Sequence, residues 1–148
     1  MTAFALDSSA VVAWVLQEAP RWRAIDAILS SPDADPILPG PALSEVITVA
    51  RKRGNASSVQ LLATALLARM RVEHCTTEDL IRAAELYEAS ERNPGPPHPR
   101  TGVPPTLSRA DSLILAVAER LRVQIVTRDR YWMDFVAAGH TRARILEI

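Results

Sequence analysis

The stretch from Leu107 to Asp129, LSRADSLILAVAERLRVQIVTRD, constrains the fold of this chain more than any other. It opens with Ser108 and Asp111, three residues apart, which is a helix-capping pattern. The apolar series that follows leaves almost no polar face, and a helix of that kind lies inside a larger body. After a short turn at Arg122, the β-branched run Val123–Val126 predicts a buried strand. We therefore expect this helix and strand at the centre of the fold.

This helix–turn–strand unit brings together two carboxylates that are far apart in the sequence. A helix of about 12 residues covers roughly 18 Å, and a turn of one or two residues sends the strand back along it. The start of the helix and the end of the strand then lie at the same edge of the sheet. Asp111 and Asp129 are predicted to be neighbours at that edge.

The remaining sequence alternates short apolar strands with helices, which predicts an α/β fold. The alternation favours a single domain over residues 1–148, with a mainly parallel sheet covered by helices on both faces in three layers. Strands are expected at 3–6, 36–38, 71–75, 123–126 and 144–148. Helices are expected at 8–16, 20–29, 41–53, 55–70, 77–91, 108–121 and 131–138.

Composition excludes several classes of protein. The 148 residues are 48% hydrophobic and 23% charged, which is typical of a soluble globular domain. The net charge of +0 gives no overall field that would attract nucleic acid or membrane, so RNA binding requires a local basic patch. Cys75 is the only cysteine, which excludes an internal disulfide and fits a reducing compartment. Without a signal peptide or a membrane-spanning run, the chain is expected in the cytoplasm, with no membrane contact.

One long segment interrupts the alternation. Residues 93–106, NPGPPHPRTGVPPT, hold six of the eleven prolines and are predicted to form a solvated loop with polyproline character. Because the loop comes immediately before the central helix, it should emerge near the edge that carries Asp111.

Four carboxylates are predicted to meet beyond the carboxyl ends of the strands, where sites form in parallel sheets. Asp7 and Asp129 end strands, and Glu45 and Asp111 lie in early turns of helices. Simpler roles remain open for single members: Asp7 as a helix N-cap, and Glu45 as an exposed acid favoured by the helix dipole. Asp79 is assigned to a capping box with Thr76 and is left out of the cluster.

Such a cluster has defined chemical consequences. Two like charges about 4 Å apart repel by roughly 4 kcal/mol at an effective dielectric near 20. The carboxylates must therefore protonate in part or bind a cation. Oxygen ligands without histidine or cysteine favour a hard divalent ion, Mg²⁺ or Mn²⁺. The chemistry that uses such a site is phosphodiester hydrolysis by a metal-activated water.

These motifs, in this order and spacing, resemble a known family over the full length of the chain. ALDSSAVVAWVLQE, ALSEV, LSRADSLILAVAERL and VTRD are similar to the motifs of PIN domains, and more narrowly of VapC-type toxins from bacterial toxin–antitoxin pairs. The resemblance implies a PIN-like α/β/α sandwich with the activity of an Mg²⁺-dependent endoribonuclease that cleaves structured RNA such as transfer or ribosomal RNA. It also implies a homodimer, inhibited by a VapB-type antitoxin that alone would contact operator DNA.

The resemblance assigns roles to individual residues. Asp7, Glu45, Asp111 and Asp129 would form the catalytic cluster, with Asp7, Asp111 and Asp129 as metal ligands. Ser9 and Thr127 would support it through hydroxyl hydrogen bonds. The loop 93–106 is longer than the family has at that place, and it bears on substrate access and on the fit of an antitoxin.

The sequence also predicts an RNA-binding patch beside the acids. The four arginines expected at or next to the acidic edge are Arg100, Arg109, Arg128 and Arg130. Phosphate contacts from such a patch would compensate for the zero net charge. Alternatively, Arg128 and Arg130 only balance nearby carboxylates.

Other functions remain open. A receiver-like signalling domain also gathers acids at strand ends, but it needs an acidic pair near the first strand and a lysine at a late strand end, and Lys52 is the only lysine. A PIN-like nuclease that is not a toxin, or a catalytically silent PIN-like interaction domain, would share the fold. Silence would be indicated by loss of one or more acids, and all four are present.

Overall fold

The structure, a computed structural model, describes all residues from 1 to 148. Five strands form the sheet: β1 (Thr2–Leu6), β2 (Ala34–Pro39), β3 (Arg71–Glu73), β4 (Gln124–Thr127) and β5 (Arg144–Glu147). Seven helices connect them: α1 (Ser8–Val15), α2 (Arg21–Ser30), α3 (Gly40–Lys52), α4 (Val59–Leu67), α5 (Thr77–Arg92), α6 (Arg109–Leu121) and α7 (Arg130–Ala137).

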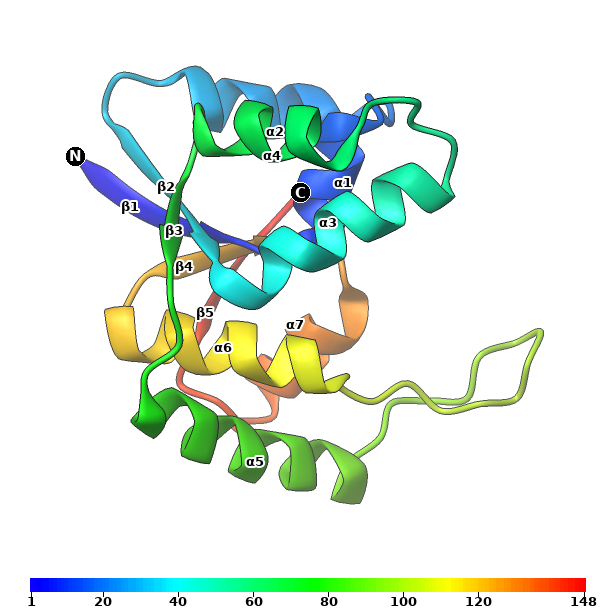
Figure 1. Ribbon diagram of the computed structural model, residues 1–148. Coiled ribbons are helices and arrows are strands. Elements are labelled where there is room, and N and C mark those ends of the chain that lie inside the picture. Colours follow the sequence, from blue (N-terminus) through cyan, green and yellow to red (C-terminus); the bar gives the residue numbers. More distant parts are fainter.

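The sheet is parallel throughout, with the strand order β3-β2-β1-β4-β5. Its central register places Leu6 opposite Val126 and Ala5 opposite Ile37. Helices cover both faces, and Figure 1 shows α2 and α4 on one side of the sheet and α5 and α6 on the other. The predicted three-layer α/β/α architecture is confirmed.

The strand order reverses direction at the centre of the sheet. From β1 the chain moves outward through β2 to β3, and it then returns to β4, on the other side of β1, before continuing to β5. At such a switch point the segments that leave two adjacent strands diverge, which leaves a crevice at their carboxyl ends. Here the two strands are β1 and β4, and the backbone N–H of Asp7 extends their ladder by donating to Val126 O over 3.0 Å.

The core lies around the three central strands, whose inner residues are apolar because both faces are covered. Ala5, Leu6, Ile125 and Val126 are completely buried. Helix α6 packs on β4, α3 and α5, and its residues from Ile114 to Ala118 are buried. The helix ends at Arg122, whose φ of 56° is the left-handed conformation that terminates many helices. The predicted helix, turn and strand are thus all present.

The predicted bounds differ most from the structure at one helix. The helix expected over 55–70 begins at Val59 and ends at Leu67. Asn55 instead accepts a hydrogen bond from Ser57 N through its side chain over 2.9 Å, and the Ser58 hydroxyl caps the helix by accepting from Leu61 N. These short polar side chains compete with the helix for its first backbone groups, so the helix starts four residues later.

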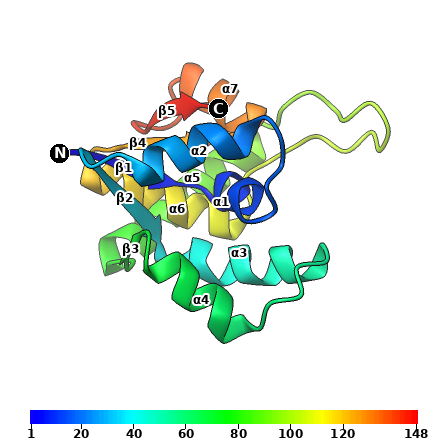
Figure 2. The same cartoon turned by 90° about the horizontal axis from the view of Figure 1, so that it is seen from above.

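The segment 93–106, here called the proline arm, contains neither helix nor strand, as predicted. Its two limbs are joined by backbone hydrogen bonds from Gly95 N to Pro105 O and from His98 N to Val103 O. A side chain at Gly95 would meet Pro105 at 2.7 Å, so only glycine allows this approach. Figures 1 and 2 both show the arm extending well beyond the body of the protein, next to the start of α6. No helix has the length and apolar character needed to cross a membrane.

Candidate active site

A cleft of about 360 Å³ opens where β1 and β4 end. All four predicted carboxylates line it, and we call it the acidic cleft. Its wall residues come from β1 and α1, from α3, and from the starts of α6 and α7: Asp7, Ser8, Ser9, Val12, Glu45, Val49, Arg53, Ser108, Asp111, Arg128 and Asp129. The acids therefore come from four separate segments of the chain, as the sequence predicts.

Asp7 is the most deeply buried of the four, with 2% of its surface exposed. Ser9 and Thr127 donate hydrogen bonds to its Oδ2 over 2.6 and 2.9 Å, as the family resemblance implies for these hydroxyls. Asp7 occupies the N-cap position of α1, but its carboxylate accepts no capping hydrogen bond from the helix. The carboxylate is therefore held by hydroxyls and directed to the cleft, and the N-cap role does not account for it.

Burial changes the acidity of Asp7. The pKa of Asp7 is raised to about 6: removal from water is the largest cause, the charges of Asp111 and Asp129 act in the same direction, and the hydroxyls of Ser9 and Thr127 oppose the shift. The charged form is thus costly unless a cation joins the site.

Asp111 stands in the first turn of α6 and serves two purposes. Its Oδ2 accepts from Ser108 N over 2.9 Å, and Ser108 Oγ accepts from Asp111 N over 3.1 Å, which completes the predicted capping box. Burial raises the pKa of Asp111, the bonds with Ser108 lower it, and the charges of Glu45 and Asp129 raise it again. The cap orients the side chain, and the second oxygen, Oδ1, remains without a protein partner.

Glu45 and Asp129 complete the cluster. Ser8 Oγ donates to Glu45 Oε1 over 2.6 Å and lies 3.3 Å from Asp7 Oδ1, so one hydroxyl links two of the acids. Glu45 is only partly exposed, and this contact distinguishes it from a freely solvated helix acid. Asp129 caps α7 by accepting from Tyr131 N through Oδ1 over 2.9 Å.

The donor set suits a hard cation. Glu45 Oε2, Asp111 Oδ1 and Asp129 Oδ2 make no hydrogen bond within the protein, although their partner oxygens do. The side-chain atoms in the cleft that could bind a metal ion are carboxylate and hydroxyl oxygens, which are the ligands that Mg²⁺ and Mn²⁺ prefer. No three His, Cys, Asp or Glu side chains in the structure are drawn together in ligand geometry. The four carboxylates instead line the cleft from separate segments.

Two arginines, Arg53 and Arg128, lie at the rim of the acidic cleft, and only Arg128 was predicted there. Arg128, which was predicted, donates to Glu18 Oε2 over 2.5 Å, and Arg53 at the end of α3 forms an ion pair with Glu18 Oε1. Although this Oε1 atom is close to the Arg53 guanidinium, it is buried and accepts no hydrogen bond of good geometry. Glu18 therefore holds both cations beside the acids, which gives Arg128 the charge-balancing contact that the sequence left open.

The other predicted arginines lie farther from the acids. The guanidinium of Arg109 is 5.7 Å from the centre of the Tyr87 ring, in a groove between α5 and α6. Arg100 is exposed in the proline arm, and Arg130 is exposed at the start of α7. None of these three lines the acidic cleft, and their contribution to RNA binding stays a prediction.

Sequence reasoning missed Ser8 and Arg53 as parts of the cleft, and it missed Glu18 as the partner of the two rim arginines. Ser8 has a local indication, because it follows Asp7 directly at a helix start. Glu18 and Arg53 have none, because their meeting depends on how α1 and α3 pack together. Asp79, by contrast, is buried away from the cleft, where it completes its predicted capping box and binds Arg120.

Comparison with known structures finds the same architecture. The chain is similar to Mycobacterium tuberculosis VapC20, described as a toxin that cleaves the sarcin-ricin loop, at 22% identity and a TM-score of 0.66, covering 95% of this chain and 98% of that one. VapBC-1 from nontypeable Haemophilus influenzae matches at 13% identity and a TM-score of 0.67, covering 99% and 98%. DNA-bound VapBC2 from Rickettsia felis matches at 13% and 0.66, covering 99% of both chains.

No curated protein matches the sequence. The family model described as "PIN domain", however, matches residues 4–137, which is nearly the whole chain and includes all four acids. This chain belongs to the PIN-domain family.

Proposed function

We propose that this protein is a metal-dependent endoribonuclease and the toxin of a bacterial toxin–antitoxin pair. The observation that carries the proposal is the convergence of Asp7, Glu45, Asp111 and Asp129 on one cleft at the switch point of the sheet. Two of the four acids have raised pKa values, and the capping bonds of Asp111 and Asp129 use only one oxygen of each, so a structural role does not account for the whole cluster.

The solved structures with this fold support the toxin assignment. One is described as a toxin that cleaves the sarcin-ricin loop, and others are toxin–antitoxin complexes, some of them bound to DNA. By analogy, the substrate here is a structured RNA, transfer or ribosomal, and the protein works in the cytoplasm. Its partners are a second copy of the chain and a VapB-type antitoxin whose C-terminal segment enters the acidic cleft. Operator DNA is contacted only through the antitoxin.

Asp7, Asp111 and Asp129 are the residues that would hold Mg²⁺ or Mn²⁺. When bound, the ion would act as a Lewis acid on the scissile phosphate and would lower the pKa of water. The hydroxyls of Ser9 and Thr127 keep Asp7 in a single orientation by occupying its Oδ2. The two capping interactions do the same for Asp111 and Asp129, which leaves one oxygen of each free for the ion.

The other residues of the cleft act on water and substrate. Glu45, whose Oε1 is fixed by Ser8, has its free Oε2 available to accept a proton from the attacking water. Arg53 and Arg128 are placed to bind a phosphate oxygen of the RNA beside the scissile bond. Because Glu18 carries one charge against their two, the pair retains a positive excess.

The direct test is cleavage of structured RNA by the purified full-length protein. We expect cleavage with Mg²⁺ or Mn²⁺ and none after removal of the ions, together with growth arrest when the protein is expressed without an antitoxin. Cleavage without growth arrest would indicate a PIN nuclease that is not a toxin. Absence of cleavage on every structured RNA tried would indicate a catalytically silent interaction domain.

A further inference from the structure

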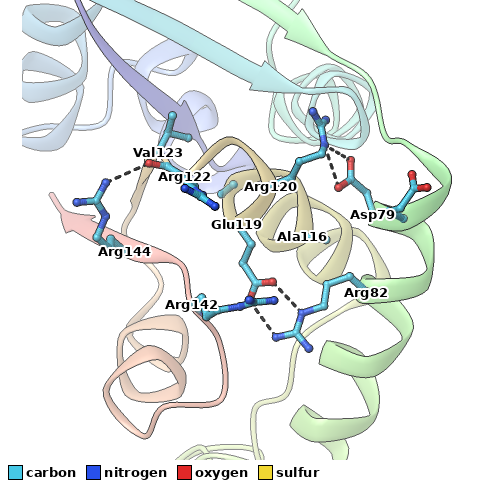
Figure 3. Close-up of a pocket in the computed structure, with 11 residues that line it drawn as sticks. Asp79, Arg82, Ala116, Glu119, Arg120, Arg122, Val123, Arg142 and Arg144 are labelled. Carbon is cyan, nitrogen blue, oxygen red and sulfur yellow. Dashed lines mark hydrogen bonds and ion pairs between the residues drawn. The ribbon is translucent and has the colours of Figure 1, made fainter.

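A second concavity lies at the opposite end of α6 from the acidic cleft. Its volume is about 690 Å³, and it is enclosed by the start of α5, the end of α6 and the starts of β4 and β5. We call it the arginine pocket, because five of its eleven lining residues are Arg82, Arg120, Arg122, Arg142 and Arg144 (Figure 3). The 13 residues of α6 separate the two concavities by about 20 Å.

Ion pairs inside the protein neutralise two of these arginines. Arg82 donates to both oxygens of Glu119 over 2.8 and 3.1 Å, and Glu119 also accepts from Thr141 and from the backbone of Arg142. Arg120 donates to both oxygens of Asp79 over 3.1 and 3.0 Å and also binds Glu73. Glu119 and Asp79 are almost inaccessible, with side chains 5% and 3% exposed. These pairs form the walls of the pocket.

The other three arginines have no carboxylate partner. Arg122, Arg142 and Arg144 are exposed, and their only side-chain hydrogen bond runs from Arg144 Nη2 to Arg122 O over 3.1 Å. Figure 3 shows that they come from neighbouring segments, with Arg144 on β5, Arg142 in the segment before it and Arg122 at the end of α6. One carboxylate without an ion-pair partner, Glu78, also lines the pocket. Three free cations against one free anion leave a local positive excess in a chain of zero net charge.

From this arrangement we propose that the arginine pocket binds the phosphate groups of a nucleotide or of a nucleic-acid backbone. Guanidinium groups fit phosphate oxygens in pairs, and three of them from separate segments can hold adjacent phosphates. The volume is in the range of small-molecule sites. Only Ala116, Ala118 and Val123 supply hydrophobic lining, so the recognition depends on charge.

Two features of the walls act against an anion and set its position. The carbonyl end of α6 carries partial negative charge, and Glu78 adds a full one on the α5 side. The carbonyl end lies beside Arg122 and is contacted by Arg144, whereas Glu78 lies with Asp79 at the start of α5, and Arg142 and Arg144 come from the segment that enters β5. The phosphates are therefore expected on the β5 side of the pocket, between Arg122, Arg142 and Arg144.

The test uses calorimetric titration of the full-length protein with pyrophosphate and with ATP in metal-free buffer at low salt. The variant R122Q/R142Q removes two of the free cations, and R142Q/R144Q serves as a second version should the turn at Arg122 fail to fold. R21Q/R23Q, on exposed positions of α2, removes the same charge elsewhere. We expect binding to the wild type and to the α2 control, and at least about a tenfold loss in the pocket variants, the equivalent of one charge-assisted hydrogen bond.

The variant D7N/D111N separates this site from the proposed nuclease. It removes metal ligands but leaves the pocket intact, so it should bind pyrophosphate like the wild type even if the protein cuts no RNA. Labelled RNA then identifies the source of the phosphates. If the slope of log RNA affinity against log salt falls by about 0.7 per lost contact in the pocket variants, the pocket binds a nucleic-acid backbone. Tight ATP binding with an unchanged RNA slope assigns it to a free nucleotide.

Two results would overturn the proposal. One is equal pyrophosphate affinity in the wild type and in both pocket variants. The other is binding of a poly-glutamate peptide as tightly as a polyphosphate of equal charge, which would make the pocket a site for protein carboxylates.

Discussion

Thr127 donates a hydrogen bond to Asp7 over 2.9 Å, and the two residues are 120 positions apart in the chain. They end the two adjacent parallel strands at which the sheet reverses its order. The bond therefore joins the switch point of the fold to the most buried acid of the cleft. A hydroxyl at this place fixes the carboxylate without neutralising it, so the site keeps its negative charge for a cation.

Divalent ions should stabilise the protein through this cleft. At an ion concentration about 100 times the Kd, binding to the native state contributes about 2.7 kcal/mol, or a rise in melting temperature of about 5 to 10 °C for a chain of this size. We expect that rise with Mg²⁺ or Mn²⁺ in the wild type and in D134N, an exposed acid of α7, and little or none in D7N/D111N. Differential scanning calorimetry measures it. An equal rise in all three proteins would remove the acidic cleft as the metal site.

The buried charge of Asp7 should make the metal-free protein less stable as the pH rises. Its pKa is about 6 in the native state against 3.8 in the unfolded chain, so between these values the native state holds a proton that the unfolded state has lost. Stability then falls through this window, by about 3 kcal/mol in all at 1.36 kcal/mol per unit.

The variant D7N isolates this effect. An amide keeps the acceptor oxygen for Ser9 and Thr127 and carries no charge, so metal-free D7N should be more stable than the wild type above pH 6 and close to it near pH 4. Urea unfolding at a series of pH values gives the difference between the two proteins. A difference that does not change with pH would show that Asp7 ionises normally.

Arg128 should contribute to RNA affinity more than Arg109. Arg128 lines the cleft, whereas Arg109 stacks over Tyr87 outside it. R128A is expected to weaken RNA binding and to lower the slope of log affinity against log salt by about 0.7, the value for one phosphate contact to a single strand. R109A is expected to have a smaller effect on affinity than R128A. Its matched control is R23A, which removes a cation stacked on Trp22.

The opposite result would move the RNA-binding face. Unchanged affinity and slope in R128A would mean that the Glu18 ion pair is the whole role of Arg128. The basic cluster at the end of α3, Arg51, Lys52 and Arg53, would then be the next face to examine.

The proline arm should affect the choice of substrate and leave the metal site intact. Its outer part, residues 96–103, can be replaced by a short Gly/Ser linker without touching its base, where Tyr131 Oη donates to Asn93 O over 2.8 Å and Gly95 N donates to Pro105 O. We expect a changed RNA affinity or cleavage pattern with an unchanged thermal shift on Mg²⁺. Identical affinity and pattern would leave the arm without a role in substrate binding, and loss of the metal shift would make it part of the site.

The sequence predicted those parts of the molecule that depend on local pattern and on the geometry of parallel sheets. The capping box at Ser108, the buried helix and the strand to Thr127 follow from residues close together in the chain. The meeting of Asp111 with Asp129 follows from the length of one helix and one turn. These local patterns and the geometry of parallel sheets were also sufficient to predict the α/β fold class.

The remainder depends on tertiary packing, which has no local pattern. The contact of Ser8 with Glu45 and the clamp of Glu18 on two arginines need the exact spacing of α1, α3 and β4. The arginine pocket likewise combines residues from α5, α6 and the entrance to β5 that look like ordinary surface charges in the sequence. The late start of α4 was missed because Asn55 and Ser58 favour a turn and a cap over a first helical turn.

The central claim is that the four acids of the cleft carry out metal-dependent cleavage of RNA. Single-turnover cleavage of a structured RNA in saturating Mg²⁺ tests it most directly, with the variants D7N, E45Q, D111N and D129N beside D134N, all first shown to be folded by calorimetry. The account predicts that each cleft variant loses at least about a hundredfold in rate, the lower range for one group in acid–base or electrostatic catalysis, while D134N cleaves like the wild type. Wild-type rates in the four cleft variants, or equal loss in D134N, would contradict it.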